Sequence, residues 1–96
     1  MDPLWALCSG RFAGWRNGDV LYNTNGDNVG HFSGEVAYSL SGSYIGEMYS
    51  KERIGQRSTA SHARRMSTMQ AMRIIAPPPK DDQLTMVVPG WEDPDF

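Results

Sequence analysis

The sequence has few of the residues that most often carry chemistry in small proteins. Its 96 residues include one cysteine and two histidines, and no apolar stretch approaches the roughly 20 residues of a membrane-spanning helix. One cysteine excludes an internal disulfide and favours a reducing, intracellular compartment. The start of the chain lacks the charged and apolar pattern of a signal peptide. We therefore expect a cytoplasmic protein that does not enter a membrane.

The motifs that would identify an enzyme or a cofactor site are also missing. Cys8, His31 and His62 do not share with the carboxylates the spacing of a zinc or iron site. The chain contains neither a phosphate-binding glycine loop nor a nucleophile elbow. A reactive thiol at Cys8 would need a basic neighbourhood, which the sequence does not show. We expect no metal, no cofactor and no catalytic residue of a known class.

A sixteen-residue repeat fills the first half of the chain. Residues 4–19, 20–35 and 36–51 align without a gap, and a degenerate fourth copy begins at residue 53. Glycine recurs at the centre of each repeat and again four residues later. Repetition with glycine at fixed positions predicts tandem supersecondary units that pack on one another. The first glycine column is Gly10, Gly26 and Gly42, and the second is Gly14, Gly30 and Gly46.

The central glycine of each repeat predicts a β-hairpin turn. The Asn-Gly pair at residues 25–26 is the strongest signal, because both central residues of a type I′ turn need positive φ. Such a turn places Tyr22 opposite Val29 and Val20 opposite His31. The second glycine column falls in mid-strand, where glycine weakens a strand. Its regular return indicates close backbone approach or a sharp bend.

The repeat resembles a known family. Residues 20–32 follow the pattern V-x-Y-x-x-x-G-x-x-V-G-x-F, and residues 4–56 together resemble the bacterial four-fold β-flower family. The resemblance implies a bacterial protein in which four petal-like hairpins surround a pseudo-four-fold axis. It implies no activity, because none is established for that family. The glycine turn of the fourth repeat is missing near residue 58, which is where the chain departs from the pattern.

These observations predict a mainly-β fold with a short C-terminal helical segment. Residues 1–58 would form pseudo-symmetric tandem hairpins in a flower-like or small barrel arrangement. Residues 59–76 form a basic segment in which Met66, Met69 and Met72 have helical spacing. A strand at residues 72–76 is the alternative, because Ile74 and Ile75 are β-branched.

The C-terminal residues 77–96 differ in composition from the rest of the chain. Three consecutive prolines at 77–79 end any helix and extend as polyproline II. The last residues combine acidic side chains with Trp91 and Phe96. Large aromatic side chains in a terminal tail usually dock, and we expect this tail to pack on its own domain or on a partner.

The charge of the chain is unevenly distributed. Residues 51–80 contain seven lysines and arginines against one glutamate, a net charge of +6, whereas residues 81–96 contain five acidic residues and no basic one. Arg57, Arg64, Arg65 and Arg73 could contact phosphates if the basic residues 51–80 bound nucleic acid. The sequence pI of about 5.5 and the absence of a nucleic-acid-binding motif argue against that function. Neutralisation of the basic segment by the acidic tail is the simpler interpretation.

One possible ligand site follows from the repeat itself. Trp15, His31 and Glu47 occupy equivalent positions in the three repeats, so pseudo-symmetry would place them at one height around the axis. His31 and Glu47 on neighbouring hairpins could then form an imidazole oriented by a carboxylate, the minimum for weak general-base work or for binding a small ligand. Polar residues on a solvated face are the alternative interpretation.

The function that the sequence favours is a small structural or protein-interaction module without catalytic activity. The hairpins contain more aromatic side chains than a small β-domain can hide, and exposed aromatic clusters mark binding surfaces. A protein partner or self-association is expected, the latter because an incomplete fourth hairpin leaves a strand edge. The residues expected at the interface are Arg57, Arg64, Arg65, Trp91 and Phe96.

Overall fold

The protein is an all-β structure in the part of the chain that the computed structural model describes, which is residues 1–57, 70–94 and 96. These residues form eight strands and no helix, which confirms the mainly-β prediction. The strands are β1 (Asp2–Ala6), β2 (Phe12–Asn17), β3 (Val20–Tyr22), β4 (Asn28–Ser33), β5 (Val36–Ser39), β6 (Tyr44–Met48), β7 (Arg53–Arg57) and β8 (Trp91–Glu92).

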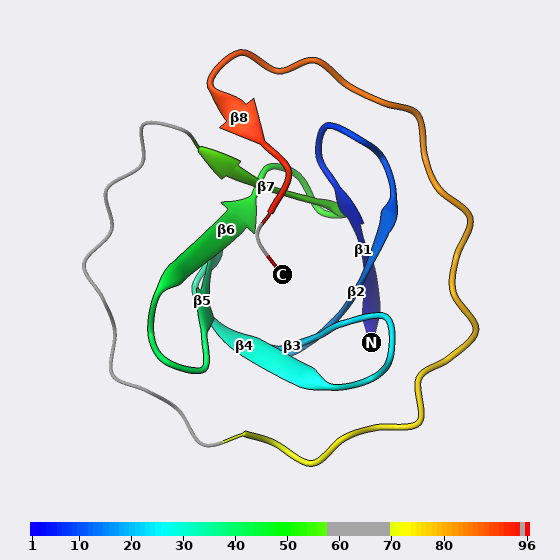
Figure 1. The fold of residues 1–96 in the computed structure, drawn as a ribbon, viewed down its shortest axis with the longest axis vertical. Coiled ribbons are helices and arrows are strands. Elements are labelled where there is room, and N and C mark those ends of the chain that lie inside the picture. The colour runs from blue at the N-terminus through cyan, green and yellow to red at the C-terminus, as the bar shows by residue number, and fades with distance from the viewer. Residues whose placement is uncertain (58–69, 95) are drawn as a thin grey trace.

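The first seven strands close into a small barrel (Figure 1). Each strand from β1 to β7 pairs antiparallel with the next, and β1 and β7 pair in parallel through Trp5 with Arg53 and Ala6 with Ile54. Strand direction alternates around the ring, so closing an odd number of strands requires one parallel pair. Closure pairs β1 with β7 and removes the open strand edge on which we based the expectation of self-association.

The three repeats are the hairpins β1–β2, β3–β4 and β5–β6, and β7 is the first strand of the degenerate fourth repeat. The prediction of a type I′ turn is wrong. Gly26 donates its N–H to the Asn23 carbonyl at 3.1 Å. Its φ is 84°, and among the described residues only glycines have positive φ. The loop is therefore a type I turn followed by a glycine bulge. Because of the bulge, Tyr22 pairs with Asn28, whereas the predicted pairing of Val20 with His31 is confirmed.

The mid-strand glycines allow neighbouring hairpins to approach closely, as the sequence predicted. A Cβ atom at Gly14 would stand against the carbonyl oxygen of Tyr22, and one at Gly30 against that of Tyr38. A Cβ at Gly46 would lie 2.9 Å from the Gly55 carbonyl oxygen. Each glycine thus faces the backbone of the next repeat. A side chain at these positions would push the hairpins apart and widen the ring.

The interior of the barrel is filled by apolar side chains. Its buried residues come from six of the seven barrel strands, and three partly buried side chains pack against them, Val29, Met48 and Phe96. Ile54 belongs to this group, so β7 contributes to the core although the sequence of the fourth repeat is degenerate. The buried members are Leu4, Leu21, Phe32, Ala37, Ile45 and Ile54.

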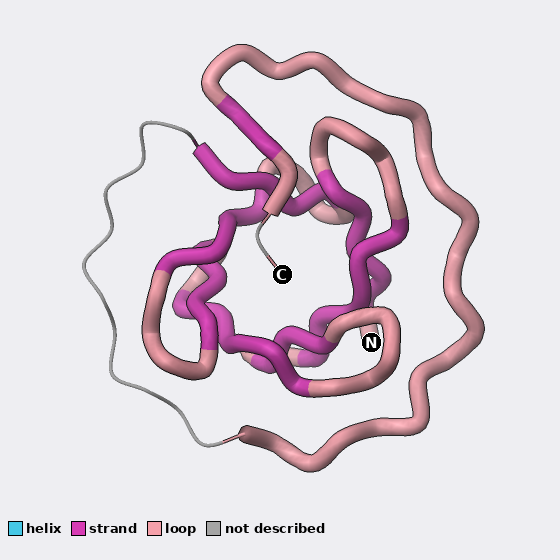
Figure 2. The backbone as a smooth tube through the Cα atoms, viewed as in Figure 1, coloured by secondary structure: helices cyan, strands magenta, loops and turns pink. Residues whose placement is uncertain are grey.

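Residues 70–88 run as an extended segment around the outside of the barrel, and we call this segment the strap (Figure 2). The predicted helix over 59–76 is wrong for residues 70–76, and its residues 59–69 lie outside the described part of the chain. The reason is that the barrel offers acceptors to the extended backbone. Ile74 donates its N–H to the Gly26 carbonyl at 3.0 Å, and Gln83 donates to the Gly10 carbonyl at 2.7 Å.

The C-terminal residues return to the barrel. In β8, Trp91 pairs with Arg57 and Glu92 pairs with Gln56, so β8 lies antiparallel beside the C-terminal end of β7. The chain then turns toward the centre of the ring, where it ends (Figure 1). Pro94 is buried and Phe96 packs against the interior residues. The tail thus lies on its own domain.

Candidate interaction surface

The predicted ring of Trp15, His31 and Glu47 lies on the outer face of the barrel. Side chains alternate between the two faces of a strand, and the following residues Phe32 and Met48 belong to the interior. Trp15 packs with Trp5, Phe12 and Tyr22 in a second apolar cluster on the outside. The three residues therefore surround the barrel and do not converge on its axis, which apolar side chains fill.

The structure also separates His31 from Glu47. His31 pairs with Tyr38 of β5, and Val36 of β5 pairs with Glu47, so a whole strand lies between the imidazole and the carboxylate. Two strand spacings amount to about 10 Å. His31 stacks on the ring of Tyr38, with ring centroids 5.9 Å apart. This arrangement does not provide an imidazole oriented by the Glu47 carboxylate.

Glu47 is engaged instead with Arg57. The Arg57 Nε lies 2.6 Å from Glu47 Oε1, and the Glu47 side chain is 13% exposed. Tyr44 donates its hydroxyl to the same oxygen at 3.2 Å. Burial and the nearby Glu47 charge raise the pKa of Tyr44, so its hydroxyl is protonated and can donate at neutral pH. The group is a polar cluster that fixes β7 against β6.

The residues expected at an interface have mostly found partners within the chain. Trp91 packs edge-on against Tyr49, with ring centroids 5.2 Å apart, and the Arg57 guanidinium lies 5.8 Å from the Trp91 ring centre. Phe96 packs on the interior residues of the barrel. Arg64 and Arg65 lie outside the described residues.

The described arginines of the basic segment bind oxygen atoms of the same chain. Arg53 donates to the carbonyls of Leu7 and Leu84 at 3.0 and 2.8 Å. Arg73 pairs with Asp27 at 3.1 Å between Nε and Oδ1. These arginines join the second half of the chain to the barrel, and their bonds do not form a row of unpaired cations for phosphates. Nucleic-acid binding through the basic residues 51–80, which include Arg64 and Arg65 outside the described part of the chain, stays a prediction.

Cys8 and Asp93 fix the C-terminal tail at the first turn. Asp93 Oδ1 accepts the backbone N–H groups of Cys8 and Ser9 at 2.9 and 3.0 Å. Burial opposes ionisation of Asp93, but the hydrogen bonds from Ser9 and Cys8, together with the charge of Arg11, outweigh burial and lower the pKa of Asp93. Burial and the charge of Asp93 raise the pKa of the Cys8 thiol. Cys8 therefore lacks the lowered pKa of a reactive thiol.

Asn28 anchors the start of the strap, a role that the sequence did not reveal. It is buried, with 4% of its surface exposed. Its Nδ2 donates to the carbonyls of Leu21 and Gly30 at 3.0 and 2.7 Å, and its Oδ1 accepts the Ala71 N–H at 2.8 Å. The sequence contained one signal of this role. Asn28 is equivalent in the repeat to Phe12 and Tyr44, which are larger and aromatic.

The strap covers the outer aromatic cluster. Ile74 and Ala76 pack against the group formed by Trp5, Phe12, Trp15 and Tyr22. The Trp5 indole donates from Nε1 to the Asp81 carbonyl at 2.8 Å, and the Asp82 carboxylate accepts the Phe12 N–H at 2.8 Å. Trp5 and Trp15, two of the aromatic side chains that we expected to be exposed, are therefore buried, whereas Phe32 lies in the barrel interior and Tyr49 is 45% exposed.

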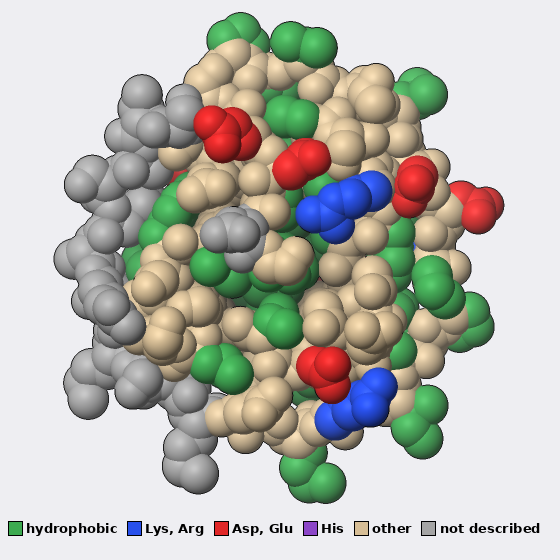
Figure 3. Space-filling model, in the orientation of Figure 1, with side chains coloured by type: hydrophobic (Ala, Val, Ile, Leu, Met, Phe, Trp, Pro, Cys, Tyr) green, Lys and Arg blue, Asp and Glu red, His purple; other side chains and the backbone are tan. Residues whose placement is uncertain are grey.

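The strap carries the four most exposed large apolar side chains of the described residues. Their exposed fractions range from 85% to 99%, and apolar side chains protrude at the rim of the molecule in Figure 3. Monomeric proteins bury most large apolar side chains, and groups of exposed ones mark interaction sites. We call the following four residues the apolar stripe: Met72, Ile75, Leu84 and Val87.

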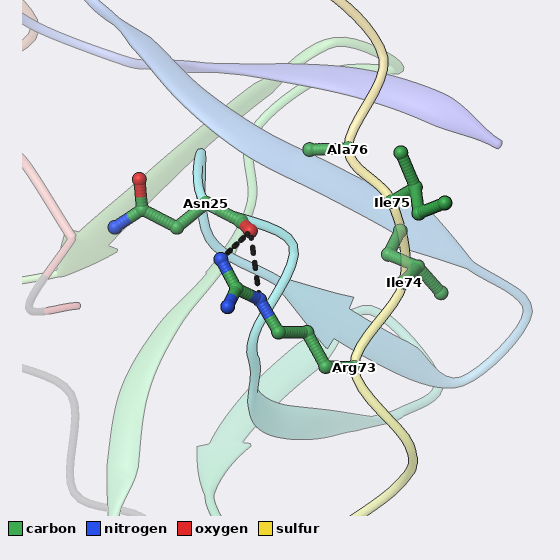
Figure 4. Close-up of a pocket in the computed structure, with 5 residues that line it drawn as sticks. All are labelled: Asn25, Arg73, Ile74, Ile75 and Ala76. Carbon is green, nitrogen blue, oxygen red and sulfur yellow. Dashed lines mark hydrogen bonds between the residues drawn. The ribbon is translucent and has the colours of Figure 1, made fainter.

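A groove lies where the strap crosses the second hairpin turn (Figure 4). It has a volume of about 360 Å³ and is lined by Asn25 and residues 73–76. The Arg73 guanidinium donates to the Asn25 carbonyl at 3.0 Å through Nη2, so this bond does not use the Asn25 side chain. Within the described residues no group of three or more histidine, cysteine or carboxylate side chains could hold a metal ion.

Comparisons with protein-family models, with curated proteins and with solved structures found no match to this chain. The resemblance to the β-flower family therefore stays a prediction. In the described part of the chain, no helix has the length and apolar character needed to span a membrane.

Proposed function

We propose that this protein is a non-catalytic interaction module that binds another protein through its strap. The observation that carries the proposal is the exposure of the apolar stripe on a domain whose own core is complete. Met72, Ile75, Leu84 and Val87 are 88%, 99%, 85% and 96% exposed. Burying such side chains against a partner would contribute about 1.5–3 kcal/mol for each one fully buried.

The position of the stripe supports a partner on the outside of the ring. The barrel interior is filled with apolar side chains, and the outer aromatic cluster lies under Ile74 and Ala76 of the strap. The groove of about 360 Å³ lies beside Ile75, where it would accept a side chain of the partner. A protein surface of complementary shape is thus the ligand that this geometry favours.

Site-directed photocrosslinking in the native host tests the proposal. A photoreactive amino acid replaces Ile75. In a control it replaces Asn17, which is exposed at the end of β2, away from the turns at Gly10 and Gly26 that the strap crosses. We expect discrete adducts from position 75 and none of these from position 17. Changing Leu84 and Val87 to serine should remove the adducts without lowering the melting temperature, because both side chains are exposed.

The mass of the adduct identifies the kind of partner. An adduct of twice the chain mass would mean self-association, and any other discrete mass would mean a different protein. The proposal fails if position 75 gives no discrete adduct, or if positions 75 and 17 give the same adducts.

A further inference from the structure

The prolines of the strap lie between two anchors on the barrel. On one side Ile74 donates its N–H to the Gly26 carbonyl, and on the other side Gln83 donates to the Gly10 carbonyl. Gly26 and Gly10 are equivalent residues of successive repeats, so the ring itself sets the span between the anchors. Residues 77–82 between them are all exposed. The barrel therefore holds this segment at both ends and leaves its side chains accessible.

The strap has the three-residue period of a polyproline II helix. The backbone N–H groups that bind the barrel or the Asn28 side chain belong to Ala71 and Ile74, and then to Gln83 and Met86. The apolar stripe follows the same period at 72 and 75 and again at 84 and 87. Nine residues separate the two pairs, which is three full turns of polyproline II and about 28 Å of length. A β-strand would show a period of two.

Proline rings on a polyproline II helix are recognised by a particular kind of surface. Domains of the SH3, WW and EVH1 type bind such segments in grooves lined by aromatic side chains. Binding is aided when the ligand already has the required conformation, because less conformational freedom is lost. Pro77, Pro78 and Pro79 meet this requirement, since the ring fixes φ and the two anchors fix the ends.

The charge beside the prolines gives the segment a direction. Lys80 is exposed and forms no ion pair with the described residues. Asp81 and Asp82 follow Lys80. The Asp82 carboxylate is turned to the barrel, where it accepts the Phe12 N–H, and the Asp81 backbone carbonyl accepts the Trp5 indole N–H. Carboxylates at one end of a binding groove would attract the lysine, and this contact would fix the direction in which the proline run binds.

We propose that residues 75–80 are a preorganised ligand for an SH3-type domain whose aromatic groove has carboxylates on its rim. The inference rests on the proposed function, because it names the partner class that the strap binds. The prolines would occupy the aromatic groove and Lys80 would bind the carboxylates. The barrel acts as the scaffold that keeps the segment extended.

Binding of the intact chain to purified SH3 domains tests this inference. The panel contains SH3 domains that prefer a proline ligand with a basic residue at one end, and one WW domain for comparison. Calorimetry compares the wild-type chain with the double variant Pro78→Ala/Pro79→Ala, with Lys80→Glu and with the control Asn17→Ser, at an exposed position outside the strap. The melting temperature of each variant is measured first, and no large change is expected at these exposed positions.

We expect at least one SH3 domain to bind the wild-type chain. The proline variant and Lys80→Glu should each bind about tenfold more weakly, a loss of about 1.4 kcal/mol, and Asn17→Ser should bind like the wild type. A free peptide of residues 74–83 should bind several-fold more weakly than the intact chain, because it lacks the anchors.

Three results would overturn the inference: no binding to any SH3 domain, SH3 binding that the proline variant does not weaken, or tighter binding to the WW domain that Lys80→Glu does not change. In each of these cases the crosslink from position 75 still reports on the interaction function separately. A crosslink that persists without SH3 binding would reject the proline ligand and leave the interaction module in place.

Discussion

The barrel and the strap are held by different kinds of interaction. Strands β1–β7 are joined by continuous backbone pairing and by an interior of buried apolar side chains. The strap is joined by separate backbone hydrogen bonds to the hairpin turns and by a few side chains, and it leaves its apolar stripe exposed. We infer that the barrel provides the stability and that the strap is a surface feature whose shape depends on the barrel.

Substitution of a mid-strand glycine should affect the barrel most strongly. In Gly30→Ala the new methyl group would meet the Tyr38 carbonyl oxygen of the next hairpin, which should lower the free energy of unfolding by about 3 kcal/mol. The control is Gly34→Ala, where no atom lies within 4 Å and only the φ of 64° opposes the change, at a cost of about 1 kcal/mol. Urea denaturation measures both. Equal losses would mean that close approach is not the function of Gly30.

Removal of the buried asparagine should affect both regions. In Asn28→Ala the carbonyls of Leu21 and Gly30 lose their donor and Ala71 loses its acceptor, which should cost about 2 kcal/mol. The matched control is Asn25→Ala, because Asn25 binds Arg73 through its carbonyl, and it should cost less than about 0.5 kcal/mol. Limited proteolysis should then cut the strap faster in Asn28→Ala. If the strap of Asn28→Ala resists proteolysis as well as that of the wild type, Asn28 does not anchor the strap.

Two neighbouring isoleucines of the strap allow the effect of a packed side chain on stability to be compared with that of an exposed one. Ile74 packs on the outer aromatic cluster, whereas Ile75 is 99% exposed. We expect Ile74→Ser to lower stability by about 1.5 kcal/mol, as for a half-buried side chain, and Ile75→Ser by less than about 0.5 kcal/mol. Thermal unfolding followed by circular dichroism measures the difference. If the order is reversed, the face that the strap turns to the barrel has been wrongly assigned.

The smallest effect is expected at the junction of the tail with the first turn, and it depends on pH. Asp93 accepts two backbone N–H groups, and its pKa in the folded protein is lowered. The stability that it contributes is present above the unfolded pKa of about 3.9 and is lost as the pH falls through the folded pKa. Asp93→Ala should cost about 1 kcal/mol at pH 7, since solvent screens the interaction.

Denaturation curves at pH 7 and pH 2.5 check this expectation. The difference between wild type and Asp93→Ala should be smaller at the lower pH, whereas Glu92→Ala, at an exposed position of β8, should change little at either pH. A difference that is the same at both pH values would show that the Asp93 charge does not hold the tail.

The repeat predicted the barrel half of the molecule well because its signals are local. A glycine at the centre of each repeat marks a tight turn, and a second glycine four residues later marks close approach of the next hairpin, which is where Gly30 meets Tyr38. The sequence did not distinguish a type I′ turn from a type I turn with a glycine bulge, because both need Gly26 in the left-handed region. The resulting shift moved the partner of Tyr22 from Val29 to Asn28.

The candidate sites were harder to predict because they depend on which face of a strand points outward. Trp15, His31 and Glu47 are indeed equivalent residues, but equivalence fixes their height and not the face that they share. The outward face places His31 beside Tyr38 and Glu47 beside Arg57. Trp5 and Trp15, two of the aromatic side chains that suggested an exposed surface, belong to the cluster on which Ile74 and Ala76 pack, and no local sequence pattern predicted this cover.

By itself the sequence determined that the chain would form short hairpins with a fixed period, because turn chemistry and glycine spacing act over a few residues. Only the tertiary structure decided that three hairpins and one extra strand close the ring through a parallel pair. It also decided that residues 70–76 extend, because the Asn28 side chain and the Gly26 carbonyl accept the backbone N–H groups of Ala71 and Ile74. Helical spacing of methionines is a local signal, and acceptors supplied by a distant part of the chain override it.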